Sequence, residues 1–216
     1  MNLFNFILLI RSLFRTDPVD IKRIQGMGLL TVKLCQLLAL RPDILATEKC
    51  TQLQKLFQNG EHLRPEGTKS LLQKVSPRGF LKNFTSLDMH PIASASIGQV
   101  HAGRLNNGDE VVIKIIKNDY IRTFQRDLRR MRRWIKIGLL VYPPLRRVGN
   151  PMGLLDHIED YTMRELDLRN EIMGCAILEK SLKILNDSGF VISKLSFPKM
   201  HPDLSNSNIL VMEKIN

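Results

Sequence analysis

Residues 90–116 read HPIASASIGQVHAGRLNNGDEVVIKII, and this stretch decides the fold that the sequence predicts. Small residues open it, an alternation of apolar and polar residues follows, and Asn107-Gly108 separates that run from a second β-prone run at 111–116. Asn-Gly between two such runs favours a hairpin, because both central residues of a type I′ turn need positive φ. We therefore expect an antiparallel hairpin that carries Lys114 among valines and isoleucines.

The position of Lys114 allows two interpretations. An unpaired buried ammonium is costly, so this side chain must either extend to solvent or meet an anion. The order of a small-residue loop followed by V-x-I-K is the layout by which a kinase N-lobe covers a nucleotide and places a lysine on its phosphates. The hairpin alone does not decide between them.

Composition narrows the class of protein. The chain has 216 residues, 44% of them hydrophobic, which is enough for a globular core, and a net charge of +11 that favours anionic partners. Its three cysteines form no C-x-x-C pair, so we expect a reducing compartment and no structural disulfide. The five histidines are not spaced as zinc ligands, so we expect no bound transition metal.

The N-terminal segment 2–14, NLFNFILLIRSLF, is apolar but is interrupted by Asn5 and Arg11. It is too short to span a bilayer, which takes roughly 20 apolar residues. It also lacks the basic start and small-residue cleavage site of a signal peptide. We expect either a helix packed on the core or a membrane-surface or targeting helix.

Four further helices and a strand are expected from periodicity and capping signals. Asp17-Pro18 is a good helix start, and Pro42 ends that helix near Leu40. The expected ranges are 17–40, 47–58, 68–75 and 154–185 for the helices and 209–212 for a final apolar strand.

A basic helix is expected at 118–137. Apolar residues recur every three or four positions, and the other side carries Arg122, Arg126, Arg129, Arg133 and Lys136. Such a face is ordinarily just solvated, but it also suits an anionic membrane surface or an acidic partner. Nucleic acid is disfavoured, because no aromatic residues interleave with the arginines to stack on bases.

Three acidic residues stand out in the segment 154–185. Glu165 and Asp167 are two apart, and Glu171 lies four residues beyond Asp167, so they can serve two different sites. They can equally be ordinary surface pairs with neighbouring arginines.

Four motifs in order resemble the UbiB/AarF atypical kinase-like family, over nearly the whole chain from about residue 20. Its K-x-G-Q motif is matched by Lys33-Leu34-Cys35-Gln36, and its alanine-rich loop by the segment 93–101, ASASIGQVH. Its E-x-D motif is matched by Glu165-Leu166-Asp167, with the helix glutamate at Glu171. Cys35 replaces the motif glycine, so its side chain is an obstruction if the backbone there must be approached closely.

The resemblance implies an α+β fold, in which a helical extension (1–85) with the K-x-G-Q-like motif precedes a kinase-like N-lobe (86–216). The N-lobe would contain a small antiparallel sheet, the inserted helix 118–137 and an αC-like helix. The resemblance further implies that Lys114 contacts the phosphates of ATP, with Glu171 as its ion-pair partner and magnesium as the accompanying ion. The residues Ala93, Ser94, Ala95 and Ser96 would cover the phosphates, Glu213 would lie in the hinge beside the adenine, and Lys33 and Gln36 would lie near Glu165 and Asp167.

The resemblance also sets the expected function and its limits. It implies an atypical kinase or ATPase linked to ubiquinone or other isoprenoid-lipid biosynthesis. We therefore expect the protein in the cytoplasm or on the cytoplasmic face of a membrane if it is bacterial, and in a mitochondrion or plastid if it is eukaryotic. Phosphoryl transfer needs a catalytic-loop Asp and Asn and a D-F-G-type Asp. We expect this chain to end at the hinge without that C-lobe, to be inactive alone, and to need a separate C-lobe polypeptide. A non-catalytic kinase-like scaffold on a membrane, a lipid or a protein partner is the alternative.

One segment imitates the missing catalytic loop. Residues 201–208, HPDLSNSN, match H-x-D-x-x-x-x-N literally, through His201, Asp203 and Asn208. The flanking segments resemble the family's strand, turn and strand into the hinge, and no D-F-G follows. We therefore interpret 201–208 as a turn.

Overall fold

The expected hairpin is the centre of a small antiparallel sheet in the computed structural model of the chain. The structure describes residues 3–15, 17–58, 62–117, 120–141, 150–188 and 195–215. Strands β3 (Gly98–Leu105) and β4 (Glu110–Ile116) pair over their length, with Arg104 opposite Glu110 and Gly98 opposite Ile116. The α+β class with a small antiparallel sheet is confirmed.

The turn of this hairpin differs from the expected type I′. Gly108 has φ 93°, but Asn107 does not have positive φ, and Leu105 N donates to Asp109 O at 2.9 Å. The loop is therefore three residues long, with glycine in the left-handed position that a Cβ would strain. Asn107 instead uses its side chain, whose Oδ1 accepts a hydrogen bond from Asp109 N at 3.1 Å.

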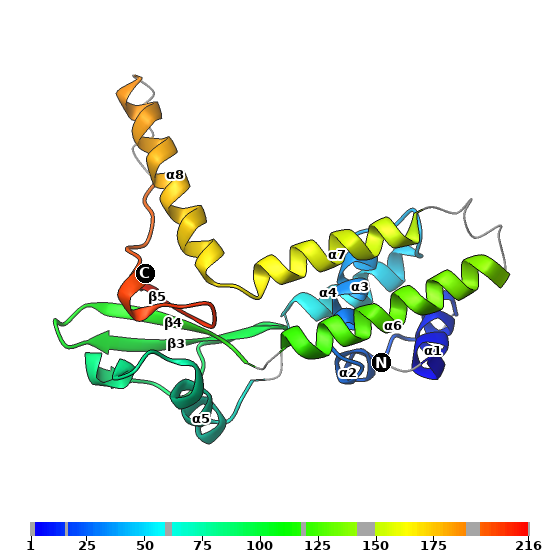
Figure 1. Cartoon of the computed structure of the whole chain (residues 1–216), viewed down its shortest axis with the longest axis horizontal. Coiled ribbons are helices and arrows are strands. Elements are labelled where there is room, and N and C mark those ends of the chain that lie inside the picture. The colour runs from blue at the N-terminus through cyan, green and yellow to red at the C-terminus, as the bar shows by residue number, and fades with distance from the viewer. Residues whose placement is uncertain are drawn as a thin grey trace. The chain divides into compact units, whose positions relative to one another are not determined.

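Three more strands complete the sheet in the order β1-β3-β4-β5, with β2 also paired to β3 (Figure 1). Strand β5 (Ile209–Glu213) pairs with β4 and confirms the expected final strand. Strands β1 (Phe84–Leu87) and β2 (Ala93–Ser94) pair with different stretches of β3. The hairpin strands are thus both interior.

One face of the sheet is buried under helix α5 (Pro65–Val75) and the 3-10 turn η1 (Phe80–Asn83). Helix α5 begins three residues before the expected position, since Pro65 occupies its first turn. The core there comprises Leu72, Phe80, Leu105, Val111, Ile113, Ile115, Ile209 and Val211. Because side chains alternate along a strand, Lys114 lies on the other face.

A polar network lies inside this apolar core. Gln99 Oε1 accepts from Leu63 N at 2.9 Å, and Gln99 Nε2 donates to Thr68 Oγ1 at 2.8 Å. Gln99 Nε2 is also 2.7 Å from His101 Nε2, which must then be the acceptor, and His101 Nδ1 is 2.9 Å from Asp88 O. His101 is therefore neutral with its proton on Nδ1, and burial lowers its pKa.

The first four of six further helices pack around a second core, which is separate from that of the sheet. Helix α1 confirms the expected N-terminal helix, and α4 has the expected bounds. The helices are α1 (Leu3–Phe14), α2 (Ile21–Gly26), α3 (Leu29–Ala39), α4 (Thr47–Gln58), α6 (Tyr120–Val141) and α7 (Pro151–Glu165). The core comprises Leu9, Leu13, Ile24, Met27, Val32, Cys35, Ala39, Leu45, Cys50, Leu53 and Leu56.

The single helix expected at 17–40 is wrong in two respects. It begins only after Asp20, whose side chain accepts from Arg23 N at 3.0 Å, because tertiary contacts hold the preceding segment. There the buried Lys49 Nζ donates to Asp17 O, and Val19 N donates to Gln52 Oε1 at 2.7 Å. The helix is then interrupted between α2 and α3 at Gly28, which has φ 102°.

The single helix expected at 154–185 is also wrong, because it divides into α7 and α8 (Arg169–Asp187). No glycine or proline marks the break at 166–168. Leu166 and Leu168 are buried there, and Leu168 N donates to Ser207 O at 3.0 Å in place of a helical bond. A tertiary contact therefore ends the helix, and a periodic sequence pattern cannot reveal it.

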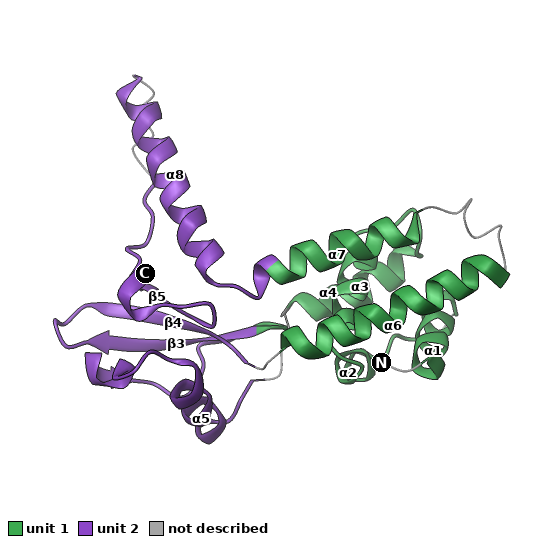
Figure 2. Cartoon of the chain, in the orientation of Figure 1, with its two compact units in different colours: residues 1–61, 95–97, 118–163 green, residues 62–94, 98–117, 164–216 purple. Residues whose placement is uncertain are grey.

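The chain forms two compact units, each discontinuous in sequence (Figure 2). Unit 1 contains residues 1–61, 95–97 and 118–163, and unit 2 contains 62–94, 98–117 and 164–216. The expected boundary between residues 85 and 86 falls within unit 2, and the inserted basic helix belongs to unit 1. The start of that helix at 118 lies outside the described residues.

The described helices include none with the length and apolar character needed to cross a bilayer.

His101 makes the stability of the protein depend on pH. The pKa of His101 is lower in the folded protein than in the unfolded chain, where it is about 6.5. Its contribution to the free energy of unfolding is therefore complete above that pH and is lost as the pH falls below it. Between pH 7 and pH 5 we expect the free energy of unfolding to fall by up to about 1.4 kcal/mol per pH unit from this group. Urea titrations at both pH values measure this slope.

The matched variants are His101→Gln and His157→Gln, since His157 is exposed. We expect His101→Gln to be less stable at pH 7 but to have a flatter pH dependence, and His157→Gln to keep the wild-type slope. An unchanged slope in His101→Gln would contradict the neutral buried imidazole.

Candidate functional site

Lys114 lies in a row of residues that crosses four strands on the face of the sheet opposite α5. Ala93 pairs with Val100, Val100 with Lys114, and Lys114 with Leu210. Residues opposite each other in antiparallel strands project to the same face, so these four side chains are neighbours. Val112 is opposite Ala102 and Met212, and it extends the row along the strands. Lys114 is thus the one cation in a row of apolar side chains, of which Val112 and Leu210 are buried and Ala93 and Val100 are accessible.

The cation has a carboxylate partner. Lys114 Nζ donates to Glu171 Oε1, and the two residues lie on β4 and in the first turn of α8. The predicted ion pair is therefore present. The side chains remain 33% and 43% exposed, and pairs of that exposure contribute at most about 1 kcal/mol to stability. The pair orients the ammonium more than it stabilises the fold.

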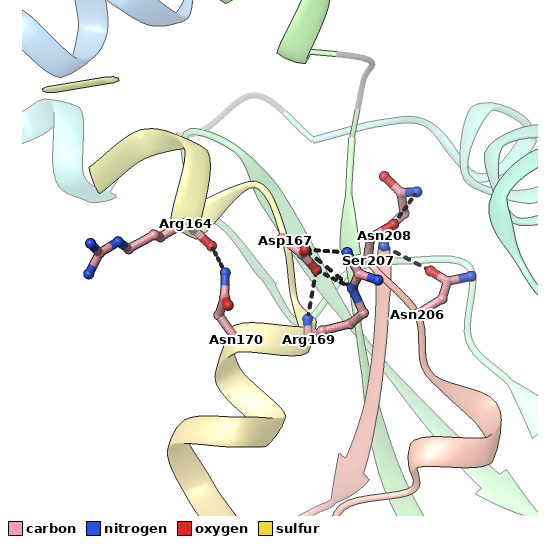
Figure 3. Close-up of polar contacts among 7 residues, drawn as sticks. All are labelled: Arg164, Asp167, Arg169, Asn170, Asn206, Ser207 and Asn208. Atoms are coloured by element: carbon pink, nitrogen blue, oxygen red, sulfur yellow. Dashed lines mark hydrogen bonds and ion pairs between the residues drawn. The ribbon is translucent and has the colours of Figure 1, made fainter. Parts of the chain in front are cut away.

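The start of α8 is fixed by contacts at its first residues (Figure 3). Asp167 accepts from Arg169 N at 3.1 Å, and its carboxylate also receives the Arg169 guanidinium, with Nη2 2.6 Å from Oδ2. These hydrogen bonds hold the pKa of Asp167 below its ordinary value. Asn170 Nδ2 donates to Arg164 O at 2.9 Å across the break between α7 and α8. Glu171 is thus positioned by a capped helix start.

The residues of the H-x-D-x-x-x-x-N match build a turn into β5. Pro202–Leu204 form the 3-10 turn η3, and Ser205 Oγ accepts from Val211 N at 3.0 Å. Asn206 Oδ1 accepts from Asn208 N and Ile209 N, at 2.8 and 3.0 Å, and its Nδ2 donates to Val75 O at 2.8 Å. Figure 3 shows this turn beside the start of α8, which Ser207 O contacts through Leu168 N.

The predicted phosphate loop is divided between the units. Ala93 and Ser94 form β2 in unit 2, where Ser94 Oγ accepts from Lys117 Nζ at 3.3 Å. Ala95 and Ser96 belong to unit 1, where Ser96 O accepts from Tyr120 Oη at 3.4 Å.

Glu213 is at the end of β5, where the hinge was expected. It pairs in register with Val111, so its side chain is on the face opposite Lys114. Its carboxylate accepts from Lys199 N at 3.0 Å. Any contact of this residue with a nucleotide on the Lys114 face would therefore have to be made by its backbone.

Lys33 and Gln36 are buried in α3 of unit 1. Lys33 Nζ lies 5.6 Å from the ring centroid of Tyr161, within cation–π range. Gln36 Nε2 donates to Leu56 O at 3.0 Å, which satisfies a carbonyl in the last turn of α4. Between them, Cys35 is fully buried in the unit 1 core, and burial raises its pKa to about 12. The side chain that replaces the motif glycine is thus accommodated by packing.

Glu165 and Asp167 belong to unit 2, so the expected proximity of Lys33 and Gln36 to them joins residues of different units and stays a prediction. Within unit 2, Asp167 has the capping role described above. The residues that sequence reasoning missed are Val100, Leu210, Asn206 and Ser207. Strand alternation could have identified the first two once the pairing register was known, but no local signal identifies the other two.

Comparisons with known proteins agree on the family. The ABC1 atypical kinase-like domain matches residues 55–216. A probable protein kinase UbiB of Vibrio parahaemolyticus is 31% identical over 194 residues, which are 89% of this chain and 34% of that protein. One from Pseudomonas entomophila is 29% identical over 193 residues, with the same coverage. The chain thus spans about a third of the length of these relatives.

A solved structure supports the fold. The chain Rv3197 of Mycobacterium tuberculosis, solved as a complex with erythromycin, matches 99% of this chain with 48% of its own length, at a TM-score of 0.51 and 19% identity. With the domain match over three quarters of its length and this shared fold, the chain is a member of the ABC1 atypical kinase-like family and is similar to UbiB proteins.

Proposed function

We propose that this chain is the nucleotide-binding part of a UbiB-type atypical kinase or ATPase, and that Lys114 binds the phosphates of ATP. The observation that supports it most is the row formed by Ala93, Val100, Lys114 and Leu210, with Glu171 paired to its lysine. In protein kinases the strand lysine that contacts the phosphates is paired with a glutamate of a separate helix, as Lys114 is here.

The side chains beside Lys114 have the properties needed to contact the adenine and the phosphates of a nucleotide. Val100 is partly exposed beside Lys114 and offers apolar surface to an adenine, whereas Val112 and Leu210 are buried neighbours of the lysine, which supplies one positive charge. The small side chains of Ala93 and Ser94 allow the β2 backbone to approach a phosphate closely. Ser94 adds a hydroxyl that is already oriented by Lys117.

Magnesium, which the family implies, does not have a protein site among the residues described. No three acidic, histidine or cysteine side chains in that part of the chain lie close enough together to hold a metal ion. Mg²⁺ prefers an octahedral shell of carboxylate, phosphate and water oxygens, and kinases supply the protein ligands from the catalytic and D-F-G loops. We derive no catalytic step through the metal.

We also propose the pathway and the location in which the protein acts. The similarity to UbiB proteins supports a role in ubiquinone or other isoprenoid-lipid biosynthesis, at the cytoplasmic side of a bacterial membrane or in a mitochondrion or plastid. If the chain does not bind a nucleotide, the alternative function is that of a non-catalytic kinase-like scaffold on a membrane, a lipid or a protein partner.

The first test is nucleotide affinity. We expect the 216-residue chain to bind ATP no more tightly than about 0.1–1 mM, because only one face of the nucleotide is contacted. Lys114→Ala should abolish the binding, and Glu171→Gln should weaken it severalfold by releasing the ammonium. Isothermal titration measures both, with Lys183→Ala on the exposed side of α8 as the matched control. Equal affinity in Lys114→Ala and the control would contradict the assignment.

The second test is turnover. The chain alone should not hydrolyse ATP with magnesium at a rate above background, because Lys114 neutralises phosphate charge but neither orients a nucleophile nor holds the metal. Phosphate release over hours, compared with Lys114→Ala, is the measurement. Robust hydrolysis that is lost in Lys114→Ala would show that the chain is catalytically complete. The turn residues His201, Asp203 and Asn208 would then be the first candidates to mutate.

A further inference from the structure

Helix α1 has an apolar surface on the side that faces away from its own core. Leu9 and Leu13 are buried, whereas Phe4 and Phe14 are 68% and 64% exposed. The exposed apolar residues recur at helical spacing: Leu3, Phe4, Ile7, Ile10 and Phe14. A surface helix ordinarily places polar residues there, and a monomer seldom exposes so continuous an apolar patch. Such a face is typical of an interaction surface.

The charges of α1 restrict the partner that this face can bind. The helix contains no acidic residue, its only charge is Arg11, and Arg15 follows its end. Both arginines are exposed. An apolar face flanked only by cations is suited to the boundary between acyl chains and anionic headgroups.

Helix α6 adds a second surface of the same kind. Its sole acidic residue, Asp127, is buried on the core side with Phe124, Leu128 and Met131. The opposite side carries four exposed cations, Arg126, Arg129, Arg133 and Lys136, and none of them forms an ion pair with a carboxylate among the described residues. It ends in the exposed apolar residues Ile137, Leu140 and Val141.

The two helices are neighbours within unit 1. The rings of Phe6 and Trp134 stack with centroids 6.1 Å apart, and this contact joins α1 to the C-terminal half of α6 (Figure 1). The apolar face of α1 and the apolar end of α6 thus belong to adjacent helices, and the cations of α6 continue along the same element.

We propose that α1 and α6 form a docking surface for an anionic lipid bilayer, in which the outer face of α1 inserts among the lipids and the α6 cations contact the headgroups. Charge argues against the other occupants. In a dimer through this surface, the α6 cations of one copy would repel those of the other. Binding of nucleic acid would not account for the five exposed apolar residues on α1. A surface-lying helix also agrees with the absence of any spanning helix among the described residues.

The test uses the whole 216-residue chain and sedimentation with vesicles of phosphatidylcholine, alone or mixed with phosphatidylglycerol. We expect binding to the mixed vesicles only, and weaker binding as salt is raised. Ile7→Gln with Phe14→Gln should reduce affinity at least tenfold through lost apolar burial. Arg126→Gln, Arg129→Gln and Arg133→Gln together should reduce it about a hundredfold, roughly fivefold per charge.

Matched controls lie in unit 2. Met173→Gln with Ile177→Gln removes two exposed apolar side chains from α8. Lys69→Gln, Lys180→Gln and Lys183→Gln remove three exposed cations from α5 and α8. Both controls should bind as the wild type does. Circular dichroism checks that each variant is folded, which is expected because all the altered side chains are exposed.

Trp134 provides a second measurement that needs no variant, since it is the only tryptophan in the chain and stacks on α1. Its fluorescence should be quenched by brominated lipid tails in the mixed vesicles. Four results would overturn the proposal: equal binding to neutral vesicles, wild-type binding by the α1 variant, equal losses in the controls, or no quenching. A dimer in solution that the α1 substitutions dissociate would also overturn it, because a second copy would then cover the face.

Discussion

The structure of unit 2 depends on one constraint, which is that a lysine stands in the middle of an interior strand. Val111, Ile113 and Ile115 on one side of β4 are buried, so Lys114 must project from the other face. Its charge is met by Glu171, and this contact requires α8 to start where its first turn reaches the sheet. Asp167, Arg169 and the 205–208 turn fix that start. On the buried face of the sheet, the polar network of Gln99 and His101 contacts α5 through the hydrogen bond from Gln99 to Thr68.

Sequence reasoning succeeded where local signals and tertiary needs agree. The hairpin and the final strand are predicted because residue alternation and the Asn-Gly signal reflect the same structure, and the Lys114–Glu171 pair is predicted from the family resemblance. It failed where distant contacts decide. The break before α8 depends on Leu168 and Ser207, and the late start of α2 depends on Lys49 and Gln52. Neither has a local marker, and the turn itself was misjudged because Asn107 used its side chain.

The two units present different surfaces to their surroundings. In unit 2 the distinctive feature is the partly exposed ion pair of Lys114 and Glu171, where we propose that the phosphates of a nucleotide bind. In unit 1 it is a pair of neighbouring helices whose outer faces carry cations and apolar side chains, with the single carboxylate of α6 turned inward.

The central claim is that the phosphates of ATP lie at Lys114. An acyl-phosphate derivative of ATP tests it most directly, because the reagent transfers its acyl group to a lysine beside the bound phosphates, and mass spectrometry identifies that lysine. We expect Lys114 to be the labelled residue, with labelling suppressed by excess ATP and moved or lost in Glu171→Gln. ATP-sensitive labelling at another lysine, such as Lys136 on α6, with none at Lys114, would contradict the claim.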